Sequence, residues 1–272
     1  MKKEVFEKKV IEFVNASRLN YISKEEAMDE SLVGLRIYAE PLFGYANAKD
    51  PLFEEWKKEE VIGAHVMLPG EWLVGAKTVI SYFLPFTEEV KKSNREGKEF
   101  PSYEWLHGRI EGQRFMLALD DYVKQVLEED GFETIVPAAD ERFKADTGVE
   151  YMSNWSERHA AYVSGLGTFG LSKGLITKKG IAGRFGSVIT KAEYEPLDRN
   201  YTGIYDYCTK CGACVRRCPV GAITLERGKE HPKCSAFLRS MKEKFAPRLG
   251  CGKCQTAVPC ESEIPNPKFR EQ

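Results

Sequence analysis

Apolar positions near the N-terminus repeat at helical spacing. Val5, Phe6, Val10 and Val14 lie on one face of a 3.6-residue repeat, and charged residues occupy positions between them. These charges interrupt what would otherwise resemble a signal peptide. The pattern therefore predicts an amphipathic helix that packs against the remainder of the fold. Further along, the segment 23–26 has the spacing of a capping box, which predicts the start of a second helical segment.

The rest of the first 200 residues mixes strand-like and helix-like patterns. Residues 77–86 are rich in β-branched and aromatic side chains and are stopped by Pro85, as expected of a buried strand. Residues 103–129 carry apolar positions at helical spacing and are followed by Gly131, a plausible C-cap. We also expect strands at 133–137, 175–177 and 185–190, a helix at 156–164, and a long loop with short helical turns at 40–76. The mixture predicts an α/β (α+β) core over residues 1–200.

Charge and hydropathy limit the classes of partner. The 272 residues include 40 basic and 41 acidic side chains, which give a net charge of −1. This balance argues against nucleic acid as a partner, because nucleic-acid binding usually leaves a basic surplus. No apolar run approaches the roughly 20 residues that a membrane-spanning helix needs. We therefore expect a soluble, cytoplasmic protein without membrane association.

The cysteines give the strongest chemical signal. All eight fall between positions 208 and 260, whereas a disulfide-stapled protein usually spreads its cysteines over the fold. Their concentration predicts a separate metal-binding domain over residues 201–272. The run C-x2-C-x2-C-x3-C-P comprises Cys208, Cys211, Cys214 and Cys218, and the later cysteines are Cys234, Cys251, Cys254 and Cys260.

This spacing is typical of a ferredoxin-like module with two [4Fe–4S] clusters. The first three cysteines of such a run hold one cluster, and the fourth, before proline, ligates the other. We assign Cys208, Cys211, Cys214 and Cys260 to the first cluster, and Cys218, Cys234, Cys251 and Cys254 to the second. The second group is irregular, so an exchange of single ligands between the clusters stays open. Zinc sites built from two C-x2-C pairs are the alternative, but the three-cysteine run is not a zinc pattern.

A family resemblance emerges upstream of the cysteines. The stretch from Ser156 to Gly170 reads SERHAAYVSGLGTFG, and it is followed by Gly174-Leu-Ile-Thr177 and Arg184-Phe-Gly-Ser-Val-Ile-Thr190. Together with the strand at 76–81 and the cysteine module, these motifs resemble epoxyqueuosine reductases and corrinoid reductive dehalogenases. The resemblance covers roughly residues 75–262. The chain looks like a short form that lacks the C-terminal helical extension with which epoxyqueuosine reductases contact tRNA.

The resemblance implies a nitroreductase-like core that holds cobalamin, with the clusters beside the corrin to reduce its cobalt. Glycines let a backbone approach a flat macrocycle closely. By resemblance, the cofactor wall comprises Gly165, Leu166, Gly167, Gly170 and Gly186. The alternative is a helix C-cap followed by a tight turn, which also requires glycine. FMN in the same core is a less favoured cofactor.

The catalytic position departs from the epoxyqueuosine reductases. Those enzymes carry an aspartate seven residues before the arginine of the Glu-Arg pair, whereas Tyr151 stands seven residues before Arg158 here. Reductive dehalogenases use a tyrosine as proton donor, so the resemblance implies Tyr151 as a general acid; a packing tyrosine is the alternative. Arg158 would anchor an anion of substrate or cofactor, or form a surface ion pair. His159 and His107 are further candidates as axial ligands or acids.

These observations predict an iron–sulfur oxidoreductase. Electrons would pass through the two [4Fe–4S] clusters to a cobalamin for reduction of an unidentified small-molecule substrate. A low-potential donor such as ferredoxin or flavodoxin would be its partner. The alternative is a non-catalytic, ferredoxin-like electron-transfer protein that feeds a partner's corrinoid or flavin.

Overall fold

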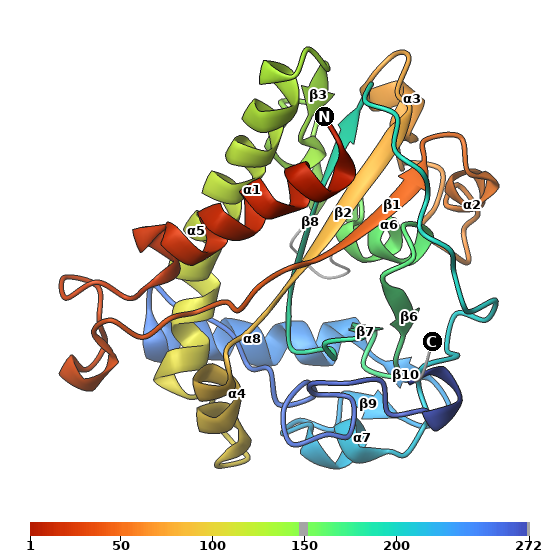
Figure 1. The fold of residues 1–272 in the computed structure, drawn as a ribbon. Helices are drawn as coiled ribbons and strands as arrows, with labels where there is room; N and C mark the ends of the chain where they lie inside the picture. The colour runs from red at the N-terminus through yellow and green to blue at the C-terminus, as the bar shows by residue number, and fades with distance from the viewer. Residues whose placement is uncertain (147–151, 271–272) are drawn as a thin grey trace.

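A four-stranded antiparallel sheet forms the centre of the protein, in the order β1-β2-β8-β3. The structure, a computed structural model, describes residues 1–146 and 152–270 (Figure 1). The sheet strands are β1 (Leu42–Asn47), β2 (Thr78–Pro85), β3 (Thr134–Ile135) and β8 (Gly183–Thr190). The helices are α1 (Lys3–Ala16), α2 (Pro51–Glu55), α3 (Pro69–Trp72), α4 (Glu88–Arg95), α5 (Tyr103–Glu129), α6 (Glu157–Val163), α7 (Ala213–Arg217) and α8 (His231–Phe245). Short hairpins pair β4 (Ala145–Asp146) with β5 (Met152–Ser153), β6 (Gly167–Phe169) with β7 (Leu175–Thr177), and β9 (Ile223–Thr224) with β10 (Gly228–Lys229).

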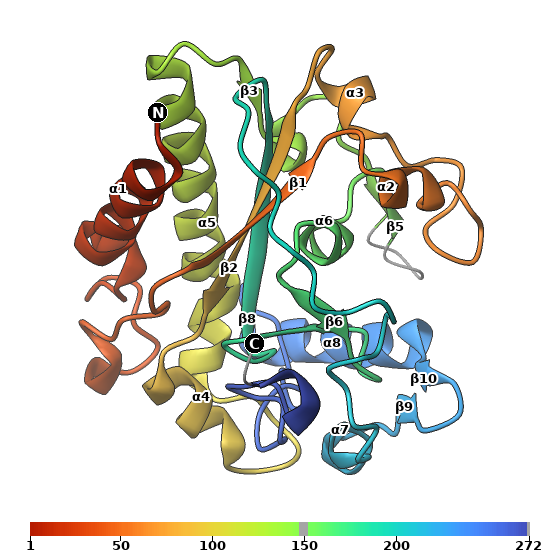
Figure 2. The same cartoon turned by 45° about the vertical axis from the view of Figure 1, so that its right-hand side comes forward.

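Helices cover both faces of the sheet. Figure 2 shows α1 and α5 on one side and α6 on the other. Ile80 and Tyr82 of β2 pack with Phe115 of α5, whereas Val79 packs with Trp155 on the opposite face. This alternation follows from the two-residue period of a strand, and burial of each large apolar side chain contributes about 1.5–3 kcal/mol. The continuous apolar run of β2 is therefore explained by burial on both faces.

Most elements expected from the sequence are present. The N-terminal helix is α1, with Phe6, Val10 and Val14 buried. The long helix is α5, whose Ser102 hydroxyl accepts a hydrogen bond from the Trp105 amide at 3.2 Å. The expected strands correspond to β2, β3, β7 and β8, and the expected helix after Ser156 is α6. The mixed α/β (α+β) class is confirmed.

Two expectations about local structure were wrong. Residues 40–76 contain the strand β1, which pairs with β2 from Leu42↔Phe83 to Asn47↔Thr78. Its interior Gly44 hid the strand pattern, but the position needs glycine because a Cβ would lie 2.4 Å from the Ser164 carbonyl oxygen. The segment after Ser23 forms a hydrogen-bonded turn and not a helix.

The cysteine-bearing segment packs below the sheet, at the end where α4 and the hairpin β6–β7 lie (Figure 1). Hydrogen bonds join it to the core: the Ile181 amide donates to the Cys260 carbonyl at 2.9 Å, and the Tyr207 amide donates to the Thr168 hydroxyl at 2.8 Å. Within the described ranges, no helix is both long and apolar enough to cross a membrane. The division into domains 1–200 and 201–272 stays a prediction.

Candidate metal centres and the adjoining cavity

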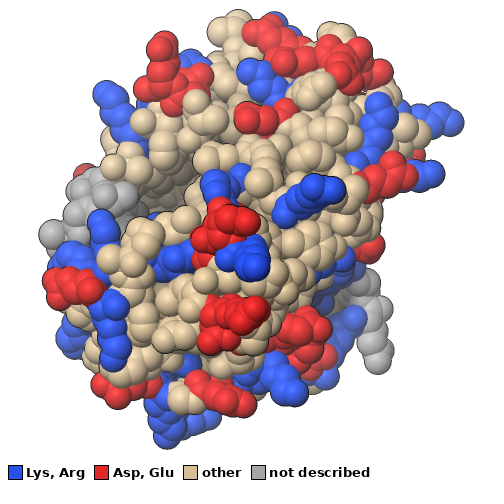
Figure 3. Space-filling model, turned by 90° about the vertical axis from the view of Figure 1, so that its left-hand side faces the viewer, with Lys and Arg blue, Asp and Glu red and all other residues tan. Residues whose placement is uncertain are grey.

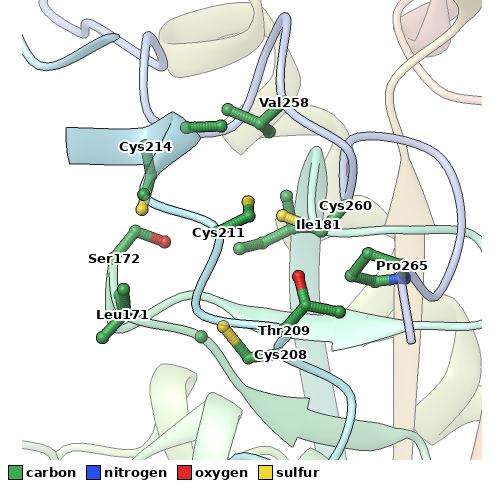
Figure 4. Close-up of a pocket in the computed structure, with 13 residues that line it drawn as sticks. Leu171, Ser172, Ile181, Cys208, Thr209, Cys211, Cys214, Val258, Cys260 and Pro265 are labelled. Carbon is green, nitrogen blue, oxygen red and sulfur yellow. The ribbon is translucent and has the colours of Figure 1, made fainter. Parts of the chain in front are cut away.

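Four cysteines surround a small cavity at the base of the core. Cys208, Cys211, Cys214 and Cys260 line it together with apolar side chains such as Ile181 and Val258 (Figure 4). Cys214 lies on α7, which follows Gly212 in the left-handed conformation with φ 71°. The Lys210 amide donates to the Cys208 sulfur at 3.4 Å. These are the four residues that the sequence assigned to the first cluster.

The other four cysteines line a second, larger cavity. Cys218 follows α7, Cys234 lies on α8, and Cys251 and Cys254 come from the loop after α8. The Ala222 amide donates to the Cys218 sulfur at 3.2 Å. All eight cysteines of the chain are free. Within residues 1–146 and 152–270, no three Cys, His, Asp or Glu side chains are grouped as a site for a single metal ion.

Electrostatics couples the cysteines within each group. Burial, together with repulsion from the thiolates of Cys254, Cys234 and Cys218, raises the pKa of Cys251 to about 12. Burial likewise raises the pKa of Cys260, with Cys208, Cys214 and Cys211 as the repelling neighbours. Thiolates are the form that ligates metal, so each group requires a nearby positive charge to hold four of them. Iron supplies such a charge.

The second cavity extends from its cysteines to the core. It measures about 520 Å³, and its core side includes Glu157, Arg158, Arg184 and Phe185. Figure 3 shows a hollow on one face of the molecule, with Lys and Arg side chains along its lower edge. The remaining walls contain aromatic, aliphatic and glycine residues, among them Phe86, Trp105, Gly108, Phe237, Leu238, Gly250 and Gly252.

The charged groups that line this cavity are mostly basic. They are Arg109, Arg158, Arg184 and Lys229, and among the described lining residues one, Glu157, is acidic. Arg158 donates a hydrogen bond to the Lys173 carbonyl, and Arg184 donates one to the Gln113 side chain. Burial lowers the pKa of Arg158. The cavity therefore favours an anionic ligand or an anionic part of a larger one.

Glu157 is held by a chain of hydrogen bonds. The Trp155 indole donates to the Ser187 hydroxyl at 2.9 Å, and this hydroxyl donates to Oε2 of Glu157 at 2.6 Å. Burial and the nearby Asp120 carboxylate together raise the pKa of Glu157 to about 8. Asp120 has a pKa raised by burial to about 7 and accepts a hydrogen bond from Tyr82. At neutral pH the Glu157 carboxyl is therefore mostly protonated.

The proposed cofactor-wall residues lie mainly within the packed core. A Cβ on Gly167 would lie 1.8 Å from the Ile176 oxygen, and one on Gly186 would lie 2.5 Å from the Tyr82 ring. Gly165 has φ +85° after α6, and Leu166 is buried. The C-cap and tight turn thus account for these glycines. Gly170 lines the small cavity of the first cysteine group, and the wall assignment itself stays a prediction.

The other candidates are dispersed. Arg158 lies in the large cavity, whereas Tyr151 lies outside the described residues. His159 Nδ1 lies 2.7 Å from the Ser156 hydroxyl, and burial lowers its pKa to about 4. His107 accepts a hydrogen bond from the Met28 amide at 3.1 Å and is fully buried. Both histidines therefore have polar partners within the fold.

Sequence reasoning missed three side chains of the large cavity. Glu157 was noted only as the glutamate of the Glu-Arg pair, and neither Arg184 nor Lys229 was singled out. Arg184 stood within a quoted motif, so its position was visible, but its chemistry depends on Gln113 and on the cavity. No local signal could identify Lys229, because its position beside the cysteines arises from the β9–β10 hairpin.

Comparison with known proteins agrees with the sequence motifs. The model of the 4Fe-4S binding domain matches residues 201–224. An epoxyqueuosine reductase from Staphylococcus aureus is 31% identical over 137 residues, which cover 47% of this chain and 34% of the relative. The matched region thus spans about a third of that enzyme.

Solved structures share the fold over nearly the whole chain. An epoxyqueuosine reductase with an epoxyqueuosine-modified tRNA-Tyr stem loop superposes with a TM-score of 0.55 at 17% identity, covering 99% of this chain and 69% of the other. A reductive dehalogenase whose structure suggests a mechanism for B12-dependent dehalogenation gives 0.52 at 16% identity, covering 84% and 31%. The resemblance is confirmed: the chain is similar to an epoxyqueuosine reductase over 137 residues, contains a 4Fe-4S binding domain, and shares its fold with epoxyqueuosine reductases and reductive dehalogenases.

Proposed function

We propose that the protein is an iron–sulfur reductase that delivers electrons to an acceptor bound in the large cavity. Cys208, Cys211, Cys214 and Cys260 would hold one [4Fe–4S] cluster, and Cys218, Cys234, Cys251 and Cys254 the second. The observation that carries the proposal is that the second cysteine group lines the same cavity as Glu157, Arg158 and Arg184. Electrons that reach the second cluster would therefore have an acceptor site directly beside them.

The donor sets fit the clusters. Each comprises four free cysteines, the number that a [4Fe–4S] cluster requires. Amide donors to Cys208 and Cys218 match the N–H···S bonds that support such clusters. Burial raises the pKa values of Cys251 and Cys260, so the positive charge of iron would be needed to hold them as thiolates.

Cobalamin is the cofactor that we favour in the cavity. The cavity has a volume of about 520 Å³ and a wall of aromatic and glycine residues, which suit part of a flat ring. The basic side chains of the cavity suit a phosphate. Arg109, Arg158 and Arg184 would hold the anionic part of the cofactor, and Phe185 would contact its apolar part. When bound, cobalamin supplies low-potential reductive chemistry. FMN is the alternative cofactor.

Glu157 would provide the proton that a reductive cleavage requires. The Trp155 indole can only donate, so it fixes the Ser187 hydroxyl as an acceptor on one side and a donor on the other. Oε2 of Glu157 accepts the hydrogen bond from that hydroxyl, which leaves Oε1 to carry the acidic proton of the neutral carboxyl. A carboxyl with a pKa near the working pH is well matched to general acid catalysis.

Cofactor retention tests the proposal. The clusters are reconstituted anaerobically, cobalamin or FMN is added, and the protein is separated from free cofactor by gel filtration. We expect co-elution of cobalamin with a base-off absorption spectrum. Arg184→Glu should weaken retention at least about tenfold, since it reverses a charge in the cavity. The matched control, Arg18→Glu on the exposed surface, should retain cobalamin normally.

The other outcomes separate the alternatives. Retention of FMN in place of cobalamin would identify a flavin reductase. A protein with both clusters that retains neither cofactor would overturn the cavity assignment and favour the ferredoxin-like carrier that feeds a partner's corrinoid or flavin. With either outcome, a low-potential ferredoxin or flavodoxin would be the electron donor to the clusters, and we propose a cytoplasmic location for the protein.

A further inference from the structure

One cysteine of the first group is accessible from outside. Cys211 is exposed, whereas the other seven cysteines are half-buried. Electron transfer slows steeply with distance, so an exposed ligand marks the shortest path from an external donor to the cluster that it holds. If the first group binds a cluster, as the proposed function states, electrons would enter at Cys211.

Arg216 and Leu225 lie beside this cysteine and its neighbour Gly212, and Lys210 links it to Tyr205. Lys210 Nζ lies 5.5 Å from the centre of the Tyr205 ring, and Arg216 Nη1 donates to the Cys211 carbonyl at 3.3 Å. A Cβ on Gly212 would lie 3.3 Å from Arg216 Nη1 and 3.5 Å from Leu225, so both side chains cover the residue next to Cys211. We call Tyr205, Lys210, Cys211, Arg216 and Leu225 the donor surface.

The donor surface combines exposed apolar area with positive charge. Tyr205 is 39% and Leu225 is 53% exposed. Between positions 205 and 225 the sequence contains three basic residues and one acidic residue, Asp206, whose carboxylate accepts hydrogen bonds from the Thr202 and Gly203 amides. Of the three, Arg217 turns inward and donates to the Asn94 and Thr256 carbonyls, which leaves Lys210 and Arg216 at the exposed side.

These features match a transient redox interface. Such interfaces are small, often below about 1,200 Å² in total, because the partners must separate after each transfer. Complementary charge then sets the association rate more than the lifetime of the complex. A basic surface of this kind selects a partner with an acidic surface.

We propose that the donor surface docks an acidic, low-potential electron-carrier protein, which reduces the first cluster through Cys211. One electron leaves the reduced iron–sulfur or flavin centre of the carrier, and the first cluster is reduced by one electron. No bond forms or breaks. Lys210 and Arg216 would orient the carrier, and Tyr205 and Leu225 would supply the apolar contact.

Stopped-flow reduction tests this surface. The probe is a reduced bacterial two-cluster ferredoxin with an acidic surface, mixed anaerobically with the reconstituted full chain. We expect the double variant Lys210→Glu/Arg216→Glu to lower the second-order rate constant at least about tenfold at low ionic strength. The neutral variant Lys210→Gln/Arg216→Gln should lie between wild type and the reversed variant. The difference should shrink as salt is added, because salt screens the attraction.

Two controls make the result specific. Lys8→Glu/Lys9→Glu on α1 changes the net charge equally at the far end of the molecule, and it should keep the wild-type rate within about twofold (Figure 1). Reduced methyl viologen, a small cation, should reduce every variant at no less than the wild-type rate, which shows that the cluster is intact.

The outcomes separate this inference from the proposed function. An unchanged ferredoxin rate in the reversed variant, or an equal loss in the α1 control, would overturn the donor surface while leaving the clusters and cavity unaffected. Absence of iron in the wild-type chain after reconstitution would instead overturn the proposed function. Iron content and the electron paramagnetic resonance spectrum of each variant distinguish these cases.

Discussion

The ammonium group of Lys253 lies 3.0 Å from the backbone oxygen of Asn94, and the two residues are fully buried. Lys253 stands between Cys251 and Cys254, whereas Asn94 lies in the last turn of α4. The Nζ atom also donates to the Glu96 carbonyl at 2.8 Å. Carbonyls at a helix C-terminus carry partial negative charge and lack partners within the helix. This lysine thereby joins the loop of the second cysteine group to the core.

Replacing this lysine should loosen that loop. Lys253→Met removes the donor and leaves two buried carbonyls without their charged partner, at a cost of about 2–4 kcal/mol. We expect a lower denaturation midpoint and faster loss of iron to a chelator, measured on the reconstituted protein. Lys92→Met, on the exposed side of α4, is the control and should behave as wild type. Equal stability of the two variants would show that the contact contributes nothing.

The acidity of Glu157 should appear in the reduction potential of the second cluster. As pH rises through about 8, the carboxyl loses its proton and places a negative charge in the cavity beside the cluster. A negative charge disfavours the added electron, so the potential should fall as pH rises from 7 to 9. Glu157→Gln is neutral throughout and should flatten this change. The measurement is a potentiometric titration followed by electron paramagnetic resonance.

Neighbouring groups must be separated from this effect. Asp120 has a raised pKa of about 7 and raises the pKa of Glu157, while Arg158, Arg184 and Lys229 line the same cavity as cations. Asp120→Asn should therefore move the fall in potential to lower pH and keep its size. A fall that persists unchanged in Glu157→Gln would assign the titration to another group.

The sequence predicted what depends on local spacing. The run from Cys208 to Cys218 indicated a 4Fe-4S binding domain because a few intervening residues fix the spacing of its cysteines. Likewise, β2 was visible because burial of all its residues favours β-branched and aromatic side chains, and β8 was visible because its buried second half contains Val188 and Ile189. The strand β1 was missed because Gly44 interrupts it, and the close approach that requires this glycine involves Ser164, far along the chain.

The cavity could not be predicted in the same way. Glu157 and Arg184 come from α6 and β8, whereas Lys229 comes from the β9–β10 hairpin of the cysteine segment. Only the packing of that segment against the core brings them together. The glycines from 165 to 170 drew attention because of their density, but a hairpin and a helix end account for them. Residue type alone cannot distinguish a glycine that admits a ligand from one that admits the protein's own backbone.

Gly252 should be essential to the second cysteine group. Its φ of +66° is a conformation that alanine rarely adopts, and an added Cβ would lie 2.0 Å from the Trp105 ring. Gly252→Ala is therefore incompatible with both the backbone and the packing of the loop. We expect iron content to fall from about eight to about four atoms per chain, because one [4Fe–4S] cluster is lost. Gly70→Ala is the control, since nothing lies within 4 Å of its added Cβ. Full iron content in Gly252→Ala would mean that the loop rearranges easily.

The division of the cysteines into two sets can be tested by combining substitutions. Cys260→Ala or Cys208→Ala alone should remove the first cluster and leave about four iron atoms per chain. Because both residues line the same cavity, the double variant should lose no more iron than either single one. Cys260→Ala combined with Cys254→Ala should lose nearly all iron, since Cys254 lines the other cavity. Cys260 and Cys254 are close in sequence and Cys208 is distant, so the result depends on the fold and not on spacing. The reverse pattern, with iron retained in the Cys260/Cys254 double variant, would place Cys260 on the second cluster.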